Sequence, residues 1–127
     1  MIEIVSDPFA SDAAMKALWL SAWGDEEPES FQPVLSRSLV HVGAFDGSLL
    51  VGFVNVAWDG GIHGFILDTC VHQQYRRQGI ASRLVRRAIV DARGRGAQWL
   101  HVDYEPRLGE FYASCGFRPS AAAVMAL

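Results

Sequence analysis

A basic loop between a strand and a helix is the stretch of this sequence best suited to chemistry. An apolar strand pattern ends at Val71, Arg76 and Arg77 follow, and a helical pattern begins after Gly79. The apolar residues of that helix recur at i, i+3, i+4, i+7, i+8 and i+11, on one face: Ala81, Leu84, Val85, Ala88, Ile89 and Ala92. The first backbone N–H groups of such a helix are unpaired, and the helix dipole makes this end partly positive. The pattern therefore predicts a site for phosphate or pyrophosphate oxygens.

The loop differs from two common phosphate-binding sequences. It lacks the Gly-Lys-Ser/Thr of a P-loop and the Gly-x-Gly-x-x-Gly of a dinucleotide-binding turn. It reads Arg-x-x-Gly-x-Ala over residues 76–81, and a second stretch reads Phe-Tyr-x-x-x-Gly-Phe over residues 111–117. Together the two stretches resemble the acetyl-CoA loop and the aromatic-Tyr-x-x-x-Gly-Phe signature of the GNAT N-acetyltransferase superfamily. The resemblance covers residues 40–117.

The resemblance implies that acetyl-CoA binds along this loop as a co-substrate. In the family, the strands before and after the long helix separate at their C-terminal ends, and the pantetheine arm enters between them. Main-chain contacts to this arm are expected at Cys70, Val71 and Gln73. The pyrophosphate is expected over the loop and first helical turn, at Arg76, Arg77, Gln78, Gly79, Ile80, Ala81 and Ser82. Gly79 suits this place because a side chain would block close approach of the backbone to phosphate.

Tyr112 is the first catalytic candidate. The resemblance places this tyrosine near the CoA sulfur, where its phenol can protonate the departing thiolate. The alternative is an aromatic residue packed in the core beside Phe111 and Phe117. Only the first interpretation requires the hydroxyl group.

Two aspartates are candidates for the general base. Asp68 interrupts an apolar strand, and Asp103 lies near the end of the strand after the long helix. His101 shares a strand face with Asp103, which predicts a hydrogen-bonded relay between them. The alternative for each residue is a surface or structurally paired position. At Glu105 the family often carries an asparagine that bonds the cofactor, and a carboxylate cannot donate that hydrogen bond.

The charge of the chain is divided between its two halves. Residues 1–68 hold ten acids and two bases, a net charge of −8, whereas residues 69–127 hold nine arginines and four acids, a net charge of +5. The acidic half, with the cluster at residues 25–29, could attract a cationic amine, and a solvated surface explains it as well. Nucleic acid is an unsuitable partner, because the domain is acidic overall and its arginines lack interleaved aromatics.

Length and composition indicate one globular domain over residues 1–127. Half of the residues are hydrophobic and 20% are charged, an ordinary balance. No apolar run reaches the ~20 residues of a membrane helix, and the N-terminus lacks a signal-peptide pattern. Cys70 and Cys115 fit buried free thiols of a cytoplasmic protein, and a catalytic role is disfavoured because no positioned base accompanies either. The four histidines lack the spacing of a metal site.

The order of predicted elements agrees with the mixed α/β fold that the resemblance implies. Alternation and turn signals predict strands at residues 1–5, 39–45, 48–58, 62–71, 99–104 and 120–127. Helices are predicted at residues 13–23, 29–36, 82–93 and 108–115. The strands at 62–71 and 99–104 must run parallel because a long helix separates them.

The chain departs from the family pattern after Phe117. Family members finish with a two-strand hairpin, whereas ten residues follow Phe117 here, so one abbreviated closing strand is expected. A sheet edge would then remain exposed. Because exposed edges invite pairing, the sequence predicts a homodimer.

These observations predict an acetyl-CoA-dependent N-acetyltransferase. The acetyl group would move to a primary amine of a small molecule or peptide by direct attack in a ternary complex. One alternative is a non-catalytic acyl-CoA-binding or sensor module that keeps the loop. A second is an interaction domain whose arginine-rich helix docks an acidic partner through Arg83, Arg86, Arg87 and Arg93.

Overall fold

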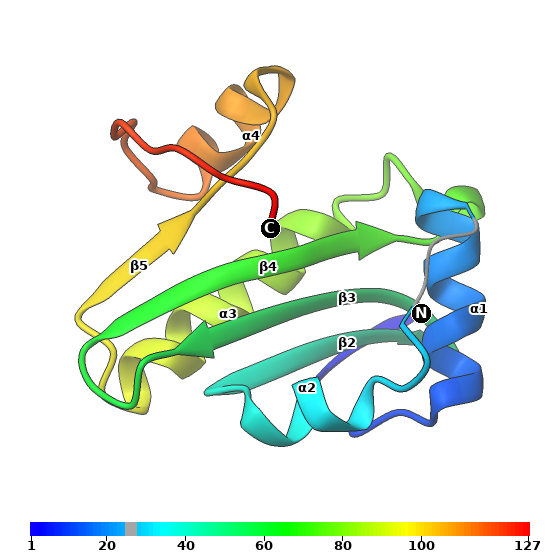
Figure 1. Ribbon diagram of the computed structural model, residues 1–127. Helices are drawn as coiled ribbons and strands as arrows, with labels where there is room; N and C mark the ends of the chain where they lie inside the picture. Colours follow the sequence, from blue (N-terminus) through cyan, green and yellow to red (C-terminus); the bar gives the residue numbers. More distant parts are fainter. Residues whose placement is uncertain (25–27) are drawn as a thin grey trace.

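A mixed five-stranded sheet runs through the part of the chain that the computed structural model describes, residues 1–24 and 28–127 (Figure 1). The strands lie in sequence order: β1 (Ile2–Ser6), β2 (Val40–Asp46), β3 (Leu49–Trp58), β4 (His63–Val71) and β5 (Trp99–Val102). The first four are antiparallel, and β4 and β5 are parallel. The mixed α/β fold and the parallel pair predicted from the sequence are therefore confirmed.

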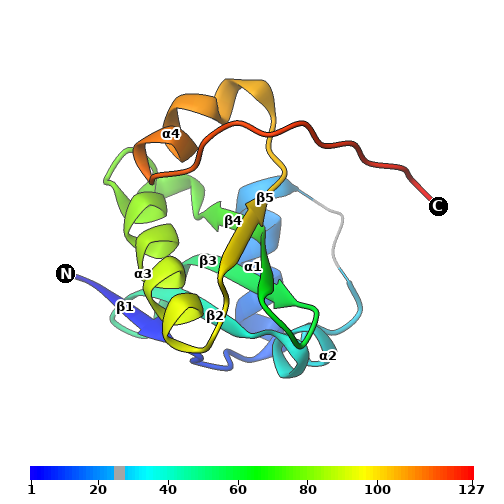
Figure 2. The same cartoon turned by 90° about the vertical axis from the view of Figure 1, so that its left-hand side faces the viewer.

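Helices cover both faces of this sheet. The helices are α1 (Asp12–Trp23), α2 (Gln32–Arg37), α3 (Ile80–Gly94) and α4 (Gly109–Ser114), with short 3-10 turns η1 (Gln73–Tyr75) and η2 (Pro106–Leu108). Figure 2 shows α3 on one side of the sheet and α1 and α2 on the other. None of the helices in the described residues has the length and apolar character needed to cross a bilayer.

The predicted apolar face of α3 forms the centre of the larger core. Leu84, Val85 and Ala88 are fully buried against valines of β2 and β3. The helix begins at Ile80, two residues before the predicted start, and Ile80 is buried as well. A second core on the opposite face is formed by α1 and α2, around Met15, Leu18, Phe31 and Leu35.

The second predicted helix starts later than the sequence indicates. It was predicted at residues 29–36, whereas α2 spans Gln32–Arg37. The carboxylate of Asp12 accepts hydrogen bonds from the Ser30 hydroxyl (2.9 Å) and the Phe31 amide (3.0 Å). These bonds tie the chain before α2 to the start of α1. Pro33 then lies in the first turn of α2, where its missing N–H costs no helical hydrogen bond.

The outer edge of β1 is capped by side chains of α3. Three of them bond to alternate residues of the strand: Arg83 to the carbonyl of Ile2 (3.0 Å), Arg87 to that of Ile4 (3.4 Å) and Asp91 to the hydroxyl of Ser6. The spacing matches because four helical residues rise about 6 Å and two strand residues about 6.7 Å. We call this arrangement the edge cap. Two of the arginines that the sequence places on the outer face of α3, Arg83 and Arg87, thus form hydrogen bonds within the chain.

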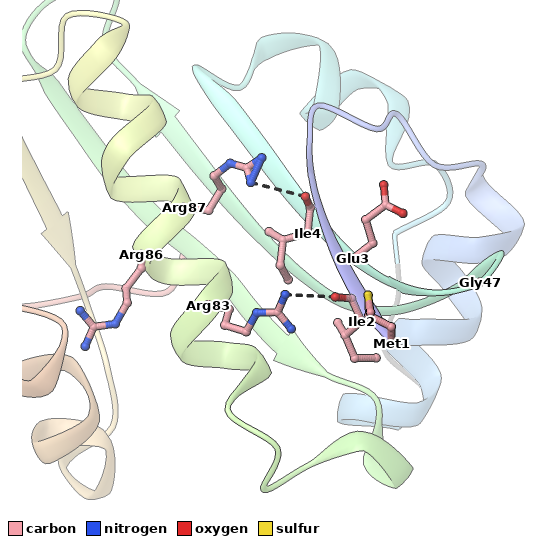
Figure 3. A pocket seen from close by; sticks show the side chains of 8 residues that line it. All are labelled: Met1, Ile2, Glu3, Ile4, Gly47, Arg83, Arg86 and Arg87. Atoms are coloured by element: carbon pink, nitrogen blue, oxygen red, sulfur yellow. Dashed lines mark hydrogen bonds between the residues drawn. The ribbon is translucent and has the colours of Figure 1, made fainter.

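The two arginines of the edge cap also border a groove of about 800 Å³ between β1 and α3 (Figure 3). Met1, Ile2, Ile4 and Gly47 line its other side. The groove lies across α3 from α4 and β5. It is therefore separate from the site predicted between β4 and β5.

The closing strand predicted at residues 120–127 is wrong. These residues belong to no helix or strand, and all of them are exposed. Figure 2 shows this end of the chain extending away from α4 without lying along the sheet. A strand also needs hydrogen bonds to a neighbouring strand, and residues 120–127 do not pair with β5, so an apolar sequence alone was not sufficient. The outer edge of β5 has no partner strand among the described residues.

A buried histidine beside β1 makes the fold sensitive to acid. His41 is 1% exposed, and its Nε2 accepts a hydrogen bond from the Phe9 amide at 3.1 Å. Its Nδ1 lies 3.6 Å from an Asp7 oxygen and has no hydrogen-bond partner in the described residues. Burial lowers the pKa of His41, Asp7 opposes that effect, and Arg95 adds to it. The imidazole is therefore neutral in the folded protein near pH 7.

The free energy of unfolding is expected to be independent of His41 above about pH 6.5 and to fall below it. Below this pH His41 is protonated in the unfolded chain but stays neutral in the folded protein. The free energy of unfolding therefore falls by at most about 1.4 kcal/mol per pH unit, until the pH reaches the lowered pKa of His41 in the folded protein. Urea unfolding from pH 8 to pH 5 measures this slope. The His41→Gln variant, which can still accept the Phe9 hydrogen bond, should be less stable at pH 8 but show a flatter profile. An equal slope in both proteins would contradict the assignment.

Candidate functional site

A β-bulge in β4 shapes the centre of the candidate site. Phe53 of β3 pairs with Cys70 and Asn55 pairs with Leu67, so two residues of β4 face one residue of β3. The extra residue is accommodated at Asp68, whose φ is 59°, a left-handed conformation uncommon for a residue other than glycine. Such a bulge bends a strand and ends regular pairing.

Beyond the bulge, β4 and β5 separate. Their parallel pairing covers only residues 63–66 and 99–102. The remainder of β4, up to Val71, has no paired strand on its β5 side, and Figure 1 shows the chain after β5 diverging from β4. Backbone groups of β4 are thus left for another extended molecule to bond. This is the geometry that the family resemblance implies for the pantetheine arm.

The loop after β4 is held in place by contacts to distant elements. The amide of His72 donates to the carbonyl of Val51 (2.7 Å), and the amide of Gln73 donates to the Ser21 hydroxyl (3.0 Å). The hydroxyl of Tyr75 donates to the Asp46 carboxylate (2.6 Å). The loop is therefore fixed between α1 and the β2–β3 hairpin before any ligand binds.

Gly79 joins this loop to α3 in a conformation that suits an anion. Its φ of 75° is left-handed, and a Cβ built on it would meet no atom within 4 Å. Glycine is required here by the backbone angle rather than by packing. No side chain of the described residues caps the start of α3, so the amides of Ile80, Ala81 and Ser82 are left for a ligand. The residues present therefore fit a phosphate group at this corner.

The two loop arginines have different surroundings. The guanidinium of Arg76 donates to the carbonyl of Ala22 (3.1 Å), in the last turn of α1, and to that of Val71 (3.4 Å). A cation is favourable at this helix end because the dipole is negative there. Arg76 thus joins α1 to the loop, whereas Arg77 is exposed with a φ of 64°. The sequence did not indicate that Arg76 has a partner in α1.

Tyr112 reaches the bulge of β4 from α4. Its side chain is 5% exposed, and its hydroxyl lies 3.4 Å from the hydroxyl of Thr69, at the long limit of a hydrogen bond. The ring stacks on Tyr104 with 5.1 Å between centroids. Burial raises the pKa of Tyr112, so the phenol keeps its proton near neutral pH. Sequence reasoning missed Thr69, although a polar residue directly after Asp68 in an apolar strand was a usable signal.

Asp68 and Cys70 flank Thr69 and differ in chemistry. Solvent reaches the carboxyl group of Asp68, but the surrounding protein desolvates it and raises its pKa. A carboxylate with a raised pKa is a better proton acceptor than an ordinary surface aspartate. Burial, with a smaller contribution from Asp68, raises the pKa of Cys70 to about 12. Cys70 is therefore a neutral thiol and does not act as a nucleophile.

The predicted relay between His101 and Asp103 is not formed. His101 Nε2 lies 2.9 Å from His63 Nδ1, and its ring stacks on Phe65. Asp103 follows the end of β5, is exposed, and has no hydrogen bond to His101 in the part of the chain described. β5 ends at Val102, so the strand alternation on which the relay depended does not extend to Asp103.

Two of the remaining acidic candidates, Glu105 and Glu29, lie within the described residues and are exposed. Glu105 pairs with Arg107 at 2.8 Å, and both side chains are exposed. Asp25, Glu26 and Glu27 lie outside the described residues, and Glu29 is exposed. Among the described residues, no group of three or more His, Cys, Asp or Glu side chains has an arrangement that could hold a metal ion.

The arrangement as a whole defines a class of protein. Free amides at a helix N-terminus, an unpaired stretch of strand backbone and a protonated phenol follow one another along the site. They suit a long phosphate-bearing carrier whose acyl end lies near Tyr112 and Asp68. This is the site of an acyltransferase that uses a CoA thioester.

Comparison with known proteins identifies the family. The chain belongs to the acetyltransferase (GNAT) family, which matches residues 4–117. A GNAT family acetyltransferase from Streptococcus pneumoniae superposes with a TM-score of 0.84 and 26% identity, covering 100% of this chain and 98% of that chain. The predicted family, fold and enzyme class are confirmed.

Two sequence relatives are similar over part of their length. Glucosamine 6-phosphate N-acetyltransferase 1 from Oryza sativa subsp. japonica is 41% identical over 54 residues, 42% of this chain and 33% of the rice protein. Mycothiol acetyltransferase from Mycobacterium ulcerans is 33% identical over 60 residues, 47% of this chain and 19% of that protein. This chain therefore matches a third or less of each relative.

Proposed function

We propose that this protein transfers the acetyl group of acetyl-CoA to the primary amine of a small molecule, by direct attack in a ternary complex. The observation that supports this function best is the position of Tyr112. Its protonated hydroxyl lies beside Thr69, at the point where β4 leaves β5. A purely structural aromatic at this position would not need a hydroxyl directed at the strand gap.

In the proposed reaction each part of the site has one task. The amides of Ile80, Ala81 and Ser82 bind the pyrophosphate, and the unpaired backbone of β4 aligns the pantetheine arm. The amine nitrogen forms a bond to the thioester carbon, and a backbone N–H near Val71 stabilises the oxyanion. The carbon–sulfur bond then breaks, Tyr112 donates its proton to the sulfur, and the amine proton passes to Asp68. Asp103 remains the alternative base.

The acceptor class is proposed from two considerations. The relatives named above are, by their names, acetyltransferases for glucosamine 6-phosphate and for mycothiol, which are small molecules. The acidic half of this chain favours a cationic amine through electrostatic attraction. A peptide amine is the alternative.

Release of the CoA thiol from acetyl-CoA, measured over a panel of amines, tests the proposed function. The panel should contain amino sugars and their phosphates, polyamines, aminoglycosides, arylalkylamines and short peptides. Thiol release above the hydrolysis rate with any member supports the function, and the preferred member identifies the acceptor. Binding of acetyl-CoA without turnover on the whole panel would favour a non-catalytic acyl-CoA-binding module.

We also propose that the protein is a homodimer that pairs through the outer edge of β5. This edge has no partner strand in the described residues, and Trp99 (54% exposed) and Phe65 (41% exposed) present apolar surface beside it. Sedimentation should give a mass of two chains at micromolar concentration. The Trp99→Lys variant is expected to sediment with the mass of one chain, because a charge on a sheet edge opposes strand pairing. A single-chain mass for the unmodified protein would contradict the proposal.

A further inference from the structure

Arg86 connects the first turn of α3 to the end of α4. Its Nε donates to the hydroxyl of Ser82 at 3.2 Å, and its Nη2 donates to the backbone carbonyl of Ser114 at 2.9 Å. Figure 3 shows Arg86 turned toward α4, whereas Arg83 and Arg87 reach in the opposite direction to β1. One guanidinium thus bridges the helix that carries the phosphate site and the helix that carries Tyr112.

The first of these bonds determines what Ser82 can do. A guanidinium is a donor only, so the Ser82 hydroxyl must accept from Arg86. Its own proton remains available, and no hydrogen bond donated by Ser82 occurs within the described residues. Ser82 lies in the uncapped first turn of α3, two residues beyond Ile80. The bridge therefore directs the hydroxyl to donate to an anion at this corner.

The second bond joins Arg86 to the C-terminal end of a short helix. α4 has six residues and no side-chain cap at its start. Ser114 is its last residue, and Tyr112 precedes it by about 3 Å of helical rise. An arginine at this end is also favoured by the helix dipole. A movement of the Ser114 carbonyl is therefore transmitted directly to Tyr112, whose hydroxyl contact with Thr69 is already 3.4 Å long.

We propose that Arg86 is a positioning residue that couples binding of the CoA pyrophosphate to the placement of the Tyr112 phenol. An anion that takes the Ser82 proton strengthens the Arg86–Ser82 bond, because polarised hydrogen bonds in a chain reinforce one another. The bridge then holds α4 in the position that presents the phenol to the sulfur. This inference rests on the proposed function and adds a residue that lies outside both sequence signatures.

A double-mutant cycle of Arg86→Ala and Tyr112→Phe tests the coupling. In the protein with Tyr112 intact, Arg86→Ala is expected to raise the KM for acetyl-CoA and to lower kcat, each about fivefold. A change of this size corresponds to the free energy of one solvent-exposed hydrogen bond. In the Tyr112→Phe background, Arg86→Ala should leave kcat almost unchanged, since the group that it positions is absent. Its effect on KM should persist.

Two control variants separate coupling from charge and from stability. Arg83→Ala removes the same charge one turn earlier on α3. Because the hydrogen bond of Arg83 goes to β1 rather than to α4, this variant should leave kcat unchanged. Arg86→Lys keeps the charge but lacks the planar fork whose two nitrogens make the two bonds, and it should restore KM and leave kcat low. Thermal unfolding of every variant shows whether α4 remains folded.

Three results would overturn the coupling. An equal loss of kcat on Arg86→Ala in both backgrounds would mean that Arg86 acts independently of Tyr112. An unchanged kcat would mean that Arg86 contributes to binding alone, and full rescue by lysine would mean that charge is sufficient. Absence of turnover in the unmodified protein across the amine panel would overturn the proposed function itself. Failure of the coupling and failure of the proposed function therefore give different results.

Discussion

Replacing Gly79 with glutamate is expected to weaken acetyl-CoA binding at least about 100-fold, a loss of about 2.7 kcal/mol. The new side chain would occupy the open space above the loop and place a negative charge where the pyrophosphate is held. The fold should survive, because a side chain at Gly79 meets no neighbouring atom. The φ of 75° adds a backbone cost of only about 1–2 kcal/mol.

Calorimetric titration of acetyl-CoA into the unmodified protein and the variants measures this effect. Gly94→Glu is the matched control, since Gly94 ends the same helix, also has open space around it, and lies about 20 Å from Gly79. It adds the same charge and should leave binding nearly unchanged. Gly79→Asn tests the backbone angle separately, because asparagine tolerates the left-handed region. Undiminished binding by Gly79→Glu would show that the pyrophosphate lies elsewhere.

Replacing Tyr112 with phenylalanine is expected to lower kcat about 100-fold, the lower end of what a general acid contributes. The KM for acetyl-CoA should change little, because the phenyl ring can keep its stacking on Tyr104. Burial raises the pKa of Tyr112, so the wild-type phenol remains a proton donor across the neutral range. The activity of the enzyme should therefore fall through deprotonation of Tyr112 only above about pH 10.

Steady-state kinetics with the acceptor found in the amine panel give both constants. Tyr104→Phe is the control, because Tyr104 stacks on Tyr112 but has no hydrogen bond to Thr69 in the described residues. It removes a hydroxyl from the same aromatic pair and should leave kcat within about twofold. If Tyr112→Phe kept full kcat, the thiolate would leave without a proton from this residue.

Local patterns were sufficient to predict most of the elements. The 3.6-residue period of α3 and the glycine before it identify both the helix and the corner where an anion can bind. The prediction failed at residues 120–127, where hydrophobicity indicated a strand but the segment does not pair with the edge of β5. The start of α2 was also displaced, because Ser30 and Phe31 donate hydrogen bonds to Asp12, which lies in α1 and is distant in sequence.

The site was predicted only where its residues lie close together in sequence. The loop at residues 76–82 and Tyr112 were predicted as candidates from their patterns. The contacts that position them connect separate elements: Arg76 to Ala22, Tyr75 to Asp46 and Arg86 to Ser114. A pairing of this kind has no signature in one sequence. His101 illustrates the converse, since its expected partner was two residues away and its observed partner, His63, lies on β4.

The edge cap has a consequence for how copies of this chain can assemble. A sheet with two free edges can add a copy at each end and grow without limit into a fibre. Here Arg83, Arg87 and Asp91 occupy the edge at β1, so among the described residues the outer edge of β5 is the edge left free for a second copy. When two copies pair through this edge, the β5 edge of each copy is covered by the other, and the assembly closes about a twofold axis. If the proposed homodimer forms, strand pairing is therefore expected to stop at two copies.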